Sequence, residues 1–383
     1  MKGVNGPYNA LFYLKILIGL QLLLVIELTT AQTIFAEKHF DLSGKIMLDT
    51  DHYGAFFDED AKKATTNIEL RQAKITAKYR PFEDWLSKLQ LKYTYENSDN
   101  HGFEVADAYI AYTGFKWADI TAGKMKEPFS LERLTGSSSL TTIERSMATS
   151  AFAPGRSYGV QLGKNRKNYT WNVGIFQEET NSDSARAVTV RTTFAPVRNK
   201  NQTLHLGVSA SIRDRQNQNF QAKQSAELNT ADNIIRSARF DADKSLLSGI
   251  EFAWQHKSIR FQSEFFAEKI EQVMGKDWRY FGYYLQASWF VTGESALYKK
   301  GRFKSVKPIS NIGALELVTR YSELGLRDNG LGSDSSIVTV GINYHWSKNL
   351  KFMVNFLTPN ISGNTLHADD SGDAISARIQ LLF

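Results

Sequence analysis

Residues 204–213 read LHLGVSASIR, and apolar side chains alternate strictly with polar or small ones along this stretch. Successive side chains of a β-strand point to opposite faces, so the stretch predicts a strand with one apolar and one wet face. The same period of two recurs along the chain, most clearly in 88–96, 106–113, 280–291 and 338–346. Almost no segment has helical periodicity. The chain is therefore predicted to be all-β.

About 16 such segments can be counted, and an even number places both chain ends on the same side of a closed barrel. Residues 236–243 can be either the beginning of a neighbouring strand or a separate strand. The predicted strands are 39–49, 67–80, 86–96, 103–113, 118–126, 156–164, 169–178, 187–195, 202–213, 243–254, 259–273, 278–291, 312–323, 335–346, 350–357 and 374–383.

Strand length and loop pattern favour an antiparallel transmembrane barrel over a soluble sandwich, which would alternate in the same way. Segments of about ten residues suit a tilted membrane crossing, whereas soluble strands average about five or six. Short turns alternate with the long polar loops 50–66, 123–159, 214–235 and 358–373. Outer-membrane barrels keep their short turns on the periplasmic side. The connection 292–311 departs from this pattern, because it is long on the short-turn side.

Aromatic residues and the last strand indicate the same environment. Trp85, Trp117, Trp254 and Trp346 all lie beside predicted short turns, where membrane barrels carry an aromatic girdle. Residues 374–383 alternate apolar and polar side chains and end in phenylalanine. This ending resembles the C-terminal signature of bacterial outer-membrane barrel proteins. A soluble β-protein that binds a ligand remains the alternative.

The N-terminus predicts export. Lys2 and Lys15 flank a start that leads into the apolar run 16–26, and small residues follow the run. This is the pattern of a secretory signal peptide, and the run is short for a membrane span. The expected domains are a signal peptide, 1–36, and a barrel, 37–383. The chain has no cysteine, which excludes disulfides and thiolate metal sites, and its net charge of +6 is only mildly basic.

Residues 123–159 form the most unusual loop, GKMKEPFSLERLTGSSSLTTIERSMATSAFAPGRSYG. Loops of this length inside a compact domain are usually functional or disordered. Its charged side chains make it net basic: Lys124, Lys126, Arg133, Arg145 and Arg156 against Glu127, Glu132 and Glu144. A barrel of about 16 strands leaves an aqueous lumen. We therefore expect residues 127–155 to fold into the lumen and narrow a channel for anions.

Several segments resemble the phosphate-selective porin O and P family. They are GKMKEPFSLE at 123–132, ERS at 144–146, PGR at 154–156, ASWFVTGE at 287–294 and GALELVTRYS at 313–322. The resemblance extends from about residue 40 to the C-terminus. It implies a trimeric outer-membrane channel of a Gram-negative bacterium, with a basic constriction that favours anions.

The resemblance also implies particular constriction residues. The segment ELRQAK at 69–74 is similar to the family's strand that sends basic residues to the constriction, so Arg71 and Lys74 are candidates. Strict alternation would turn Arg71 towards lipid, so either a bulge intervenes or Lys74 is the lumen residue. Asp107 resembles the acidic partner at the narrow site, and Lys124 and Lys126 match basic positions before the inward loop. Gln72 stands where a second arginine is expected.

Further candidates follow from parity, which here means the alternation of lipid-facing and lumen-facing side chains along a strand. Arg191, Arg213, Arg239 and Arg320 fall on polar faces. Arginine suits phosphate because its planar fork donates two hydrogen bonds to one group. The competing interpretation is a lumen wall in which these arginines are balanced by acids, namely Glu251, Glu264 and Glu316.

The sequence thus predicts an outer-membrane porin that passes small hydrophilic solutes by passive diffusion and prefers anions, phosphate or polyphosphate first. Its expected partners are membrane lipid, small anions and two further copies of the chain; no cofactor and no nucleic acid are expected. The seven histidines are scattered without a catalytic or metal-binding motif, so an enzyme is not expected. A weakly selective general porin for organic acids or sugars stays open, because Gln72 and the acids Asp107, Glu127 and Glu132 reduce the basic character of the constriction.

Overall fold

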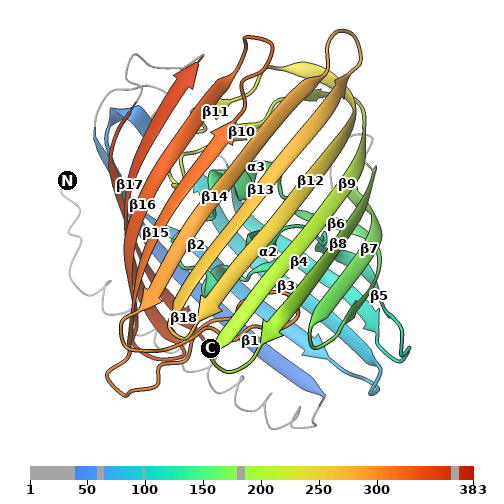
Figure 1. The fold of residues 1–383 in the computed structure, drawn as a ribbon, viewed down its shortest axis with the longest axis vertical. Coiled ribbons are helices and arrows are strands. Elements are labelled where there is room, and N and C mark those ends of the chain that lie inside the picture. Colours follow the sequence, from blue (N-terminus) through green and yellow to red (C-terminus); the bar gives the residue numbers. More distant parts are fainter. Residues whose placement is uncertain (1–38, 58–63, 98–99, 179–185, 364–370) are drawn as a thin grey trace, which may run out of the picture.

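The structure is a computed structural model that describes residues 39–57, 64–97, 100–178, 186–363 and 371–383. The expected signal peptide, 1–36, lies outside the described residues. Within them, 18 strands form, of which sixteen close into one antiparallel barrel. The barrel closes where β1 (Phe40–Tyr53) pairs with β18 (Ala374–Leu382) on one side and β2 (Thr65–Tyr79) on the other. The predicted barrel of about 16 strands is confirmed (Figure 1).

The other strands follow one another around the wall, and two short ones, β10 and β11, form a separate small sheet. Their bounds are β3 (Trp85–Asn97), β4 (Asn100–Tyr112), β5 (Asp119–Lys126), β6 (Arg156–Asn165), β7 (Tyr169–Glu178), β8 (Arg186–Arg198), β9 (Gln202–Phe220), β10 (Lys223–Gln224), β11 (Ile235–Arg236), β12 (Phe240–His256), β13 (Ile259–Gln272), β14 (Trp278–Phe290), β15 (Ala314–Gly325), β16 (Ser333–His345) and β17 (Leu350–Gly363). The helical segments are α2 (Leu131–Leu134), α3 (Met147–Phe152) and the 3-10 turns η1 (Ala55–Phe57) and η2 (Ser137–Ser139). No helix in the described part of the chain is long and apolar enough to cross a membrane.

The apolar faces of the strands point outward. Along β9, Leu206, Val208 and Ile212 are 41–62% exposed, while His205 and Ser211 on the opposite face are buried. The same division holds along β14, β16 and β18. A soluble sandwich would bury these apolar faces against each other, so that alternative is wrong. In lipid the closed sheet leaves no unpaired strand edge exposed to hydrocarbon.

Both described ends of the chain and the short connections share one end of the barrel, called here the terminal end. The tight connections 166–168, 257–258 and 346–349 lie there (Figure 1). Trp117 and Trp346, both 61% exposed, and Trp85 accompany these turns, as the predicted girdle requires. In outer-membrane barrels this end faces the periplasm, and the opposite, far end faces the exterior.

Three strands extend beyond their predicted ends because pairing continues into the expected loops. β1 extends to Tyr53, β9 to Phe220 and β17 to Gly363, beyond the expected loop starts at 50, 214 and 358. Residues 236–243 do not form a separate strand, since Arg236 ends β11 and β12 begins at Phe240. The extended parts stay paired with neighbouring strands, for example at Phe220, which lies opposite Phe240.

Candidate functional site

Residues 127–155, between β5 and β6, fold into the bore as expected and are called here the constriction segment. α2 and α3 lie inside the barrel behind its wall (Figure 1). Ser130 caps α2 by accepting a hydrogen bond from the backbone N–H of Arg133, and Ser146 caps α3 in the same way through Thr149. These two serines explain why a segment without apolar periodicity still forms two helical turns.

Charged side chains of the wall hold this constriction segment in place. Arg320 donates to the Oε1 of Glu132 at 3.3 Å and also to Glu227. Arg71 and Arg378 both donate to Glu144, at 2.9 Å and 2.7 Å. Opposite α2, the carboxylate of Glu264 on β13 accepts the backbone N–H groups of Leu131 and Glu132 at 2.8 Å and 2.7 Å. Arg213 pairs in turn with Glu127.

A dry core fills one side of the bore near the far end. Residues 221–239, which include the second half of the long polar loop expected at 214–235, fold into the mouth with the β10–β11 sheet. Leu228, Ile234 and Ile235 pack with Phe57 and Phe129 in a cluster of buried apolar residues. The expectation of a polar loop is wrong for residues 226–235, because this part carries apolar side chains that the inner wall near β13–β17 buries. The open path is therefore confined to the opposite side.

That path contains a cavity of about 870 Å³ lined mainly by β1–β6 and the constriction segment. Among the described residues that line it, fourteen are lysine or arginine and three are aspartate or glutamate (Asp107, Asp119 and Glu144). The cations are Lys45, Arg71, Lys74, Lys88, Lys92, Lys126, Arg133, Arg145, Arg156, Arg191, Lys300, Arg302, Lys304 and Arg378. The cavity wall is therefore strongly electropositive.

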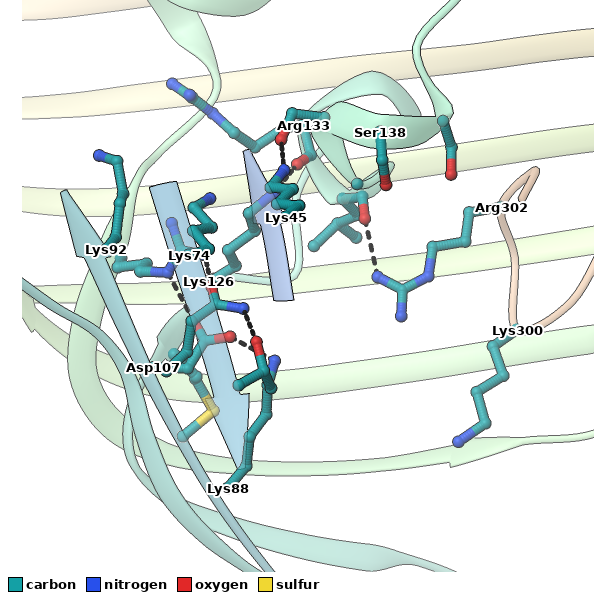
Figure 2. A pocket seen from close by; sticks show the side chains of 18 of the residues that line it. Lys45, Lys74, Lys88, Lys92, Asp107, Lys126, Arg133, Ser138, Lys300 and Arg302 are labelled. Carbon is teal, nitrogen blue, oxygen red and sulfur yellow. Dashed lines mark hydrogen bonds and ion pairs between the residues drawn. The ribbon is translucent and has the colours of Figure 1, made fainter. Parts of the chain in front are cut away.

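Besides Lys300, Arg302 and Lys304 of the connection between β14 and β15, five of these cations belong to no ion pair within the described part of the chain: Lys45, Lys74, Lys126, Arg133 and Arg145. Four of them donate to neutral oxygens. Lys45 donates to the hydroxyl of Ser137, and Lys126 to the carbonyl of Arg133. Arg133 Nε donates to the Ala153 carbonyl at 2.9 Å, and Arg145 to the Thr135 carbonyl at 2.9 Å. Figure 2 shows several of these side chains gathered at the constriction.

Three lysines stand side by side across the wall. Lys45 on β1 is directly opposite Lys74 on β2, which is directly opposite Lys92 on β3. Like charges directly opposite each other destabilise a sheet. Lys92 is paired with Glu104 at 2.7 Å, but Lys45 and Lys74 have no carboxylate partner among the residues the structure describes. Such a row makes physical sense where an anion supplies the missing negative charge.

Among the described residues, Asp107 is one of three acids that line the cavity with these lysines (Figure 2). Its Oδ2 lies 2.5 Å from Lys88 Nζ, and its Oδ1 lies 2.6 Å from Arg156 Nε. One carboxylate is thus shared by two cations, and the group keeps a net positive charge. Arg156 reaches further to the Gln90 side-chain oxygen at 3.2 Å.

A bulge in β2 resolves the orientation of Arg71. The register shifts between Met47, opposite Gln72, and Asp49, opposite Glu69. Both Arg71 and Gln72 therefore reach the lumen, where Arg71 binds Glu144 and Gln72 accepts from Ser137 at 3.2 Å. Lys74 also lines the cavity. Both alternatives left open by the sequence are therefore correct: a bulge turns Arg71 to the lumen, and Lys74 is a lumen residue as well.

Electrostatic crowding is visible on the constriction segment itself. Burial, and then the neighbouring Arg145 and Arg156, lower the pKa of Arg133 to about 9, so it stays charged at neutral pH. Burial alone would raise the pKa of Glu144, but Arg71 and Arg378 outweigh it and hold that pKa well below its usual value. Glu144 is therefore a fixed anchor, whereas Arg133 is a cation surrounded by other cations.

Arg71 and Arg156 pair with Glu144 and Asp107, and five further predicted candidates also lie outside the group of uncompensated cations. Lys124 pairs with Ala108 and Tyr158, its Nζ lies 5.6 Å from the Tyr158 ring, and it does not line the cavity. The lumen position expected for Lys124 is wrong, because the side chain shares a face with the half-exposed Tyr158. Arg239 is exposed before β12 and donates to Gln221, so its expected lumen position is wrong as well. Strand parity does not apply there, because Arg239 precedes the strand.

The remaining three arginines are on the inner face but are neutralised by acids. Arg191 pairs with Glu251, Arg213 with Glu127 and Glu178, and Arg320 with Glu132 and Glu227. All three are at most 3% exposed. These three arginines therefore belong to a lumen wall in which acids balance the cations, which was the competing interpretation. Of the acids proposed for that role, Glu251, Glu264 and Glu316, only Glu251 pairs with one of these arginines.

Sequence reasoning missed Lys45 and the cations of residues 291–313. Lys45 could have been found by parity, because it is two residues from Met47 and four from Asp49, which face the lumen. Lys300, Arg302 and Lys304 lie on the unusually long connection between β14 and β15. Its length was a signal, but nothing in the sequence pattern indicated that it enters the bore.

Comparisons with known proteins give the following. The family model described as "Phosphate-selective porin O and P" matches residues 40–383. Porin O of Pseudomonas aeruginosa is 25% identical over 394 aligned positions, which cover 91% of this chain and 89% of that protein. Among solved structures, the anion-selective porin from Comamonas acidovorans has a TM-score of 0.58 at 13% identity, covering 90% of this chain and 99% of that one. The trimer form of Vibrio cholerae OmpT also has a TM-score of 0.58, at 9% identity, with the same two coverages.

Proposed function

Because this chain belongs to the phosphate-selective porin O and P family, we propose that it conducts small anions across the outer membrane by passive diffusion, with phosphate or polyphosphate preferred. The observation that carries this proposal is the opposed pair Lys45 and Lys74, joined by Lys126 and Arg133, without carboxylate partners among the described residues. Selectivity in a pore follows from the sign and density of charge at its narrowest point. As a porin, the protein is a channel and not an enzyme.

The mechanism requires weak and repeated binding. In water, the attraction between two unit charges 4 Å apart is only about 1 kcal/mol. Several staggered cations are therefore needed to attract an anion, and no single one binds it tightly. Lys45 and Lys74 are point charges, whereas Arg133 and Arg156 use Nε and NH2 for contacts within the protein and can present the rest of the guanidinium group to phosphate oxygens. Asp107 moderates the charge between Lys88 and Arg156 and so limits the residence time of the anion.

Export and assembly belong to the same proposal. Residues 1–36 act as a cleaved signal peptide, supported by the basic start and apolar run 16–26. The protein forms a homotrimer, supported by the family resemblance and by the trimer form among its fold neighbours. Intact-mass measurement of the mature protein and crosslinking of the purified channel test these two points.

The charge preference is tested with the purified channel in a planar bilayer. In a KCl gradient the reversal potential is expected to have the sign of chloride permeation, and added phosphate is expected to block the chloride current. A reversal potential with the sign of potassium permeation removes the anion proposal altogether.

A weakly selective general porin is the second candidate. Gln72 and the hydroxyls of Ser137, Ser138 and Ser139 line the cavity beside the cations and offer neutral hydrogen-bonding groups. Equal block by phosphate, organic acids and sugars would favour this candidate. Block by phosphate at concentrations where the others have no effect favours the first.

The conductance is expected to depend on pH through Lys304. Burial first, and then Arg302 and Lys300, lower the pKa of Lys304 to about 8. The side chain is mostly charged at pH 7 and mostly neutral at pH 9, so anion conductance and the anion-to-cation permeability ratio should both fall over this range. A Lys304→Met variant should have the lower value at pH 7 and a flatter profile. A profile identical to that of the unchanged protein would contradict the assignment.

A further inference from the structure

The connection between β14 and β15 returns into the bore from the terminal end instead of turning tightly. Its residues Ala296, Tyr298, Phe303 and Val306 are buried and pack with Leu131 of α2 and with the inner wall. The other face of the same connection carries Lys300, Arg302 and Lys304, which line the cavity. Figure 2 shows Lys300 and Arg302 on this segment, across from the lysines of β1–β3.

A buried polar cluster of the wall contacts this connection at two points. Arg191 donates through Nε and NH2 to the carboxylate of Glu251 at 2.7 Å and 2.6 Å, and NH2 also donates to the Gly301 carbonyl at 3.0 Å. His205 lies between Glu251 and Tyr298, with Nε2 3.0 Å from Glu251 Oε2 and Nδ1 2.6 Å from the Tyr298 hydroxyl. These four side chains are at most 6% exposed.

An ion pair in such a place is poor support for stability. Removing two charges from water is costly, and an apolar pair of the same volume often serves the fold as well. Here Arg191 of the ion pair contacts the Gly301 carbonyl, and His205 contacts the Tyr298 hydroxyl. Both partners belong to the connection between β14 and β15. Arg191 is therefore unavailable to a passing anion, and its contacts connect strands β8, β9 and β12 with the connection.

The position of Gly301 fits a tightly held contact. Its φ is +66°, a conformation that side-chain-bearing residues rarely adopt. An added Cβ would lie 3.0 Å from Thr193 Oγ1 and 3.3 Å from Arg191 NH1. A side chain at this position would force the neighbouring side chains to shift by a few tenths of an ångström, so a glycine suits this close approach.

The held connection touches the constriction segment directly. Arg302 NH1 donates to the Leu134 carbonyl at 2.7 Å, and the hydroxyls of Ser305 and Ser139 are 2.8 Å apart. The two segments that enter the bore from opposite ends therefore meet. Any displacement of the connection moves Arg302 and Lys304 and removes support from the constriction segment.

We propose that Arg191, Glu251, His205 and Tyr298 are positioning residues: they hold the connection 291–313 inside the bore, and thereby place its cations and brace the constriction segment. This rests on the proposed function only in its effect on selectivity. The placement itself is a separate claim with a separate measurement.

The placement is tested with a thiol reporter, which is clean because the chain has no cysteine of its own. Ala296→Cys puts a small buried thiol on the face of the connection that packs against the inner wall. Tyr298→Phe removes one hydroxyl without changing the ring, and the loss of one buried hydrogen bond should raise the rate of thiol modification about fivefold. Gly301→Ala should act in the same direction. Tyr283→Phe, which removes a tyrosine hydroxyl bonded to Glu323 on the outer wall, is the matched control and should leave the rate unchanged.

Its effect on the channel is tested by rescue. Tyr298→Phe should lower the anion-to-cation permeability ratio. When Ser139→Cys and Ser305→Cys are added to the Tyr298→Phe variant, oxidation to a disulfide should restore the ratio, and reduction of the disulfide should lower it again. Equal modification rates in Tyr298→Phe and Tyr283→Phe overturn the proposal, as does a permeability ratio that is unchanged or that the disulfide does not restore. Heat-modifiable migration on gels shows that each variant forms the barrel. A cation-selective unchanged protein would remove the proposed function but leave the reporter result standing.

Discussion

Replacing Lys74 with glutamine is expected to lower the anion-to-cation permeability ratio by up to about 30-fold. A unit charge 4 Å away in water favours an anion by about 1 kcal/mol and disfavours a cation by the same amount, so its removal shifts the ratio by about 2 kcal/mol. Lys74 is the most informative target because it lies between Lys45 and Lys92 and its ammonium group has no hydrogen-bond or ion-pair partner within the described part of the chain. Reversal potentials in a KCl gradient measure the effect, and Lys74→Glu should move the preference further towards cations.

The matched control lies on the same strand. Lys78 is four residues away, pairs with Asp41 at 2.9 Å and does not line the cavity. Lys78→Gln should therefore leave the permeability ratio within experimental error. Equal effects of the two substitutions would mean that the overall charge of the barrel, and not the row of lysines, sets selectivity.

Arg320→Met is expected to cost about 3–5 kcal/mol in the free energy of unfolding, because it leaves buried acids without their cation. Arg320 contacts Glu132 at 3.3 Å, Glu227, the Thr142 hydroxyl at 2.6 Å and the Glu144 carbonyl at 3.1 Å. Its loss also releases the constriction segment, so single-channel conductance should rise. Urea unfolding of the refolded protein in lipid or detergent measures the first effect, and bilayer recording measures the second.

Two further variants separate this anchor from a general effect of lost charge. Arg239→Met removes an exposed arginine at the far end and should change stability by no more than about 0.5 kcal/mol. Glu132→Gln combined with Arg320→Met should recover part of the loss, because one unpaired carboxylate is then removed. A double variant that is less stable than Arg320→Met alone would contradict the pairing.

The sequence predicted the wall of the barrel well because the required information is local. A period of two along a strand assigns each side chain to lipid or lumen, as in 204–213, and the strand positions followed from it. The entry of residues 127–155 into the bore also followed, from length and charge. Parity failed at Arg239, where it does not apply because the residue precedes a strand. The family resemblance misplaced Lys124, which follows a glycine whose φ is +128°.

The sequence by itself determined which segments form strands and which face of each strand is apolar, since both depend on neighbours one or two residues apart. Only the tertiary structure decided which cations remain free. Arg320 finds Glu132 at a separation of 188 residues and Arg378 finds Glu144 at 234, and these distant acids neutralise them. Parity says which way a charge points but not what stands opposite it across the bore, and a cation attracts a solute only when no carboxylate has already satisfied it.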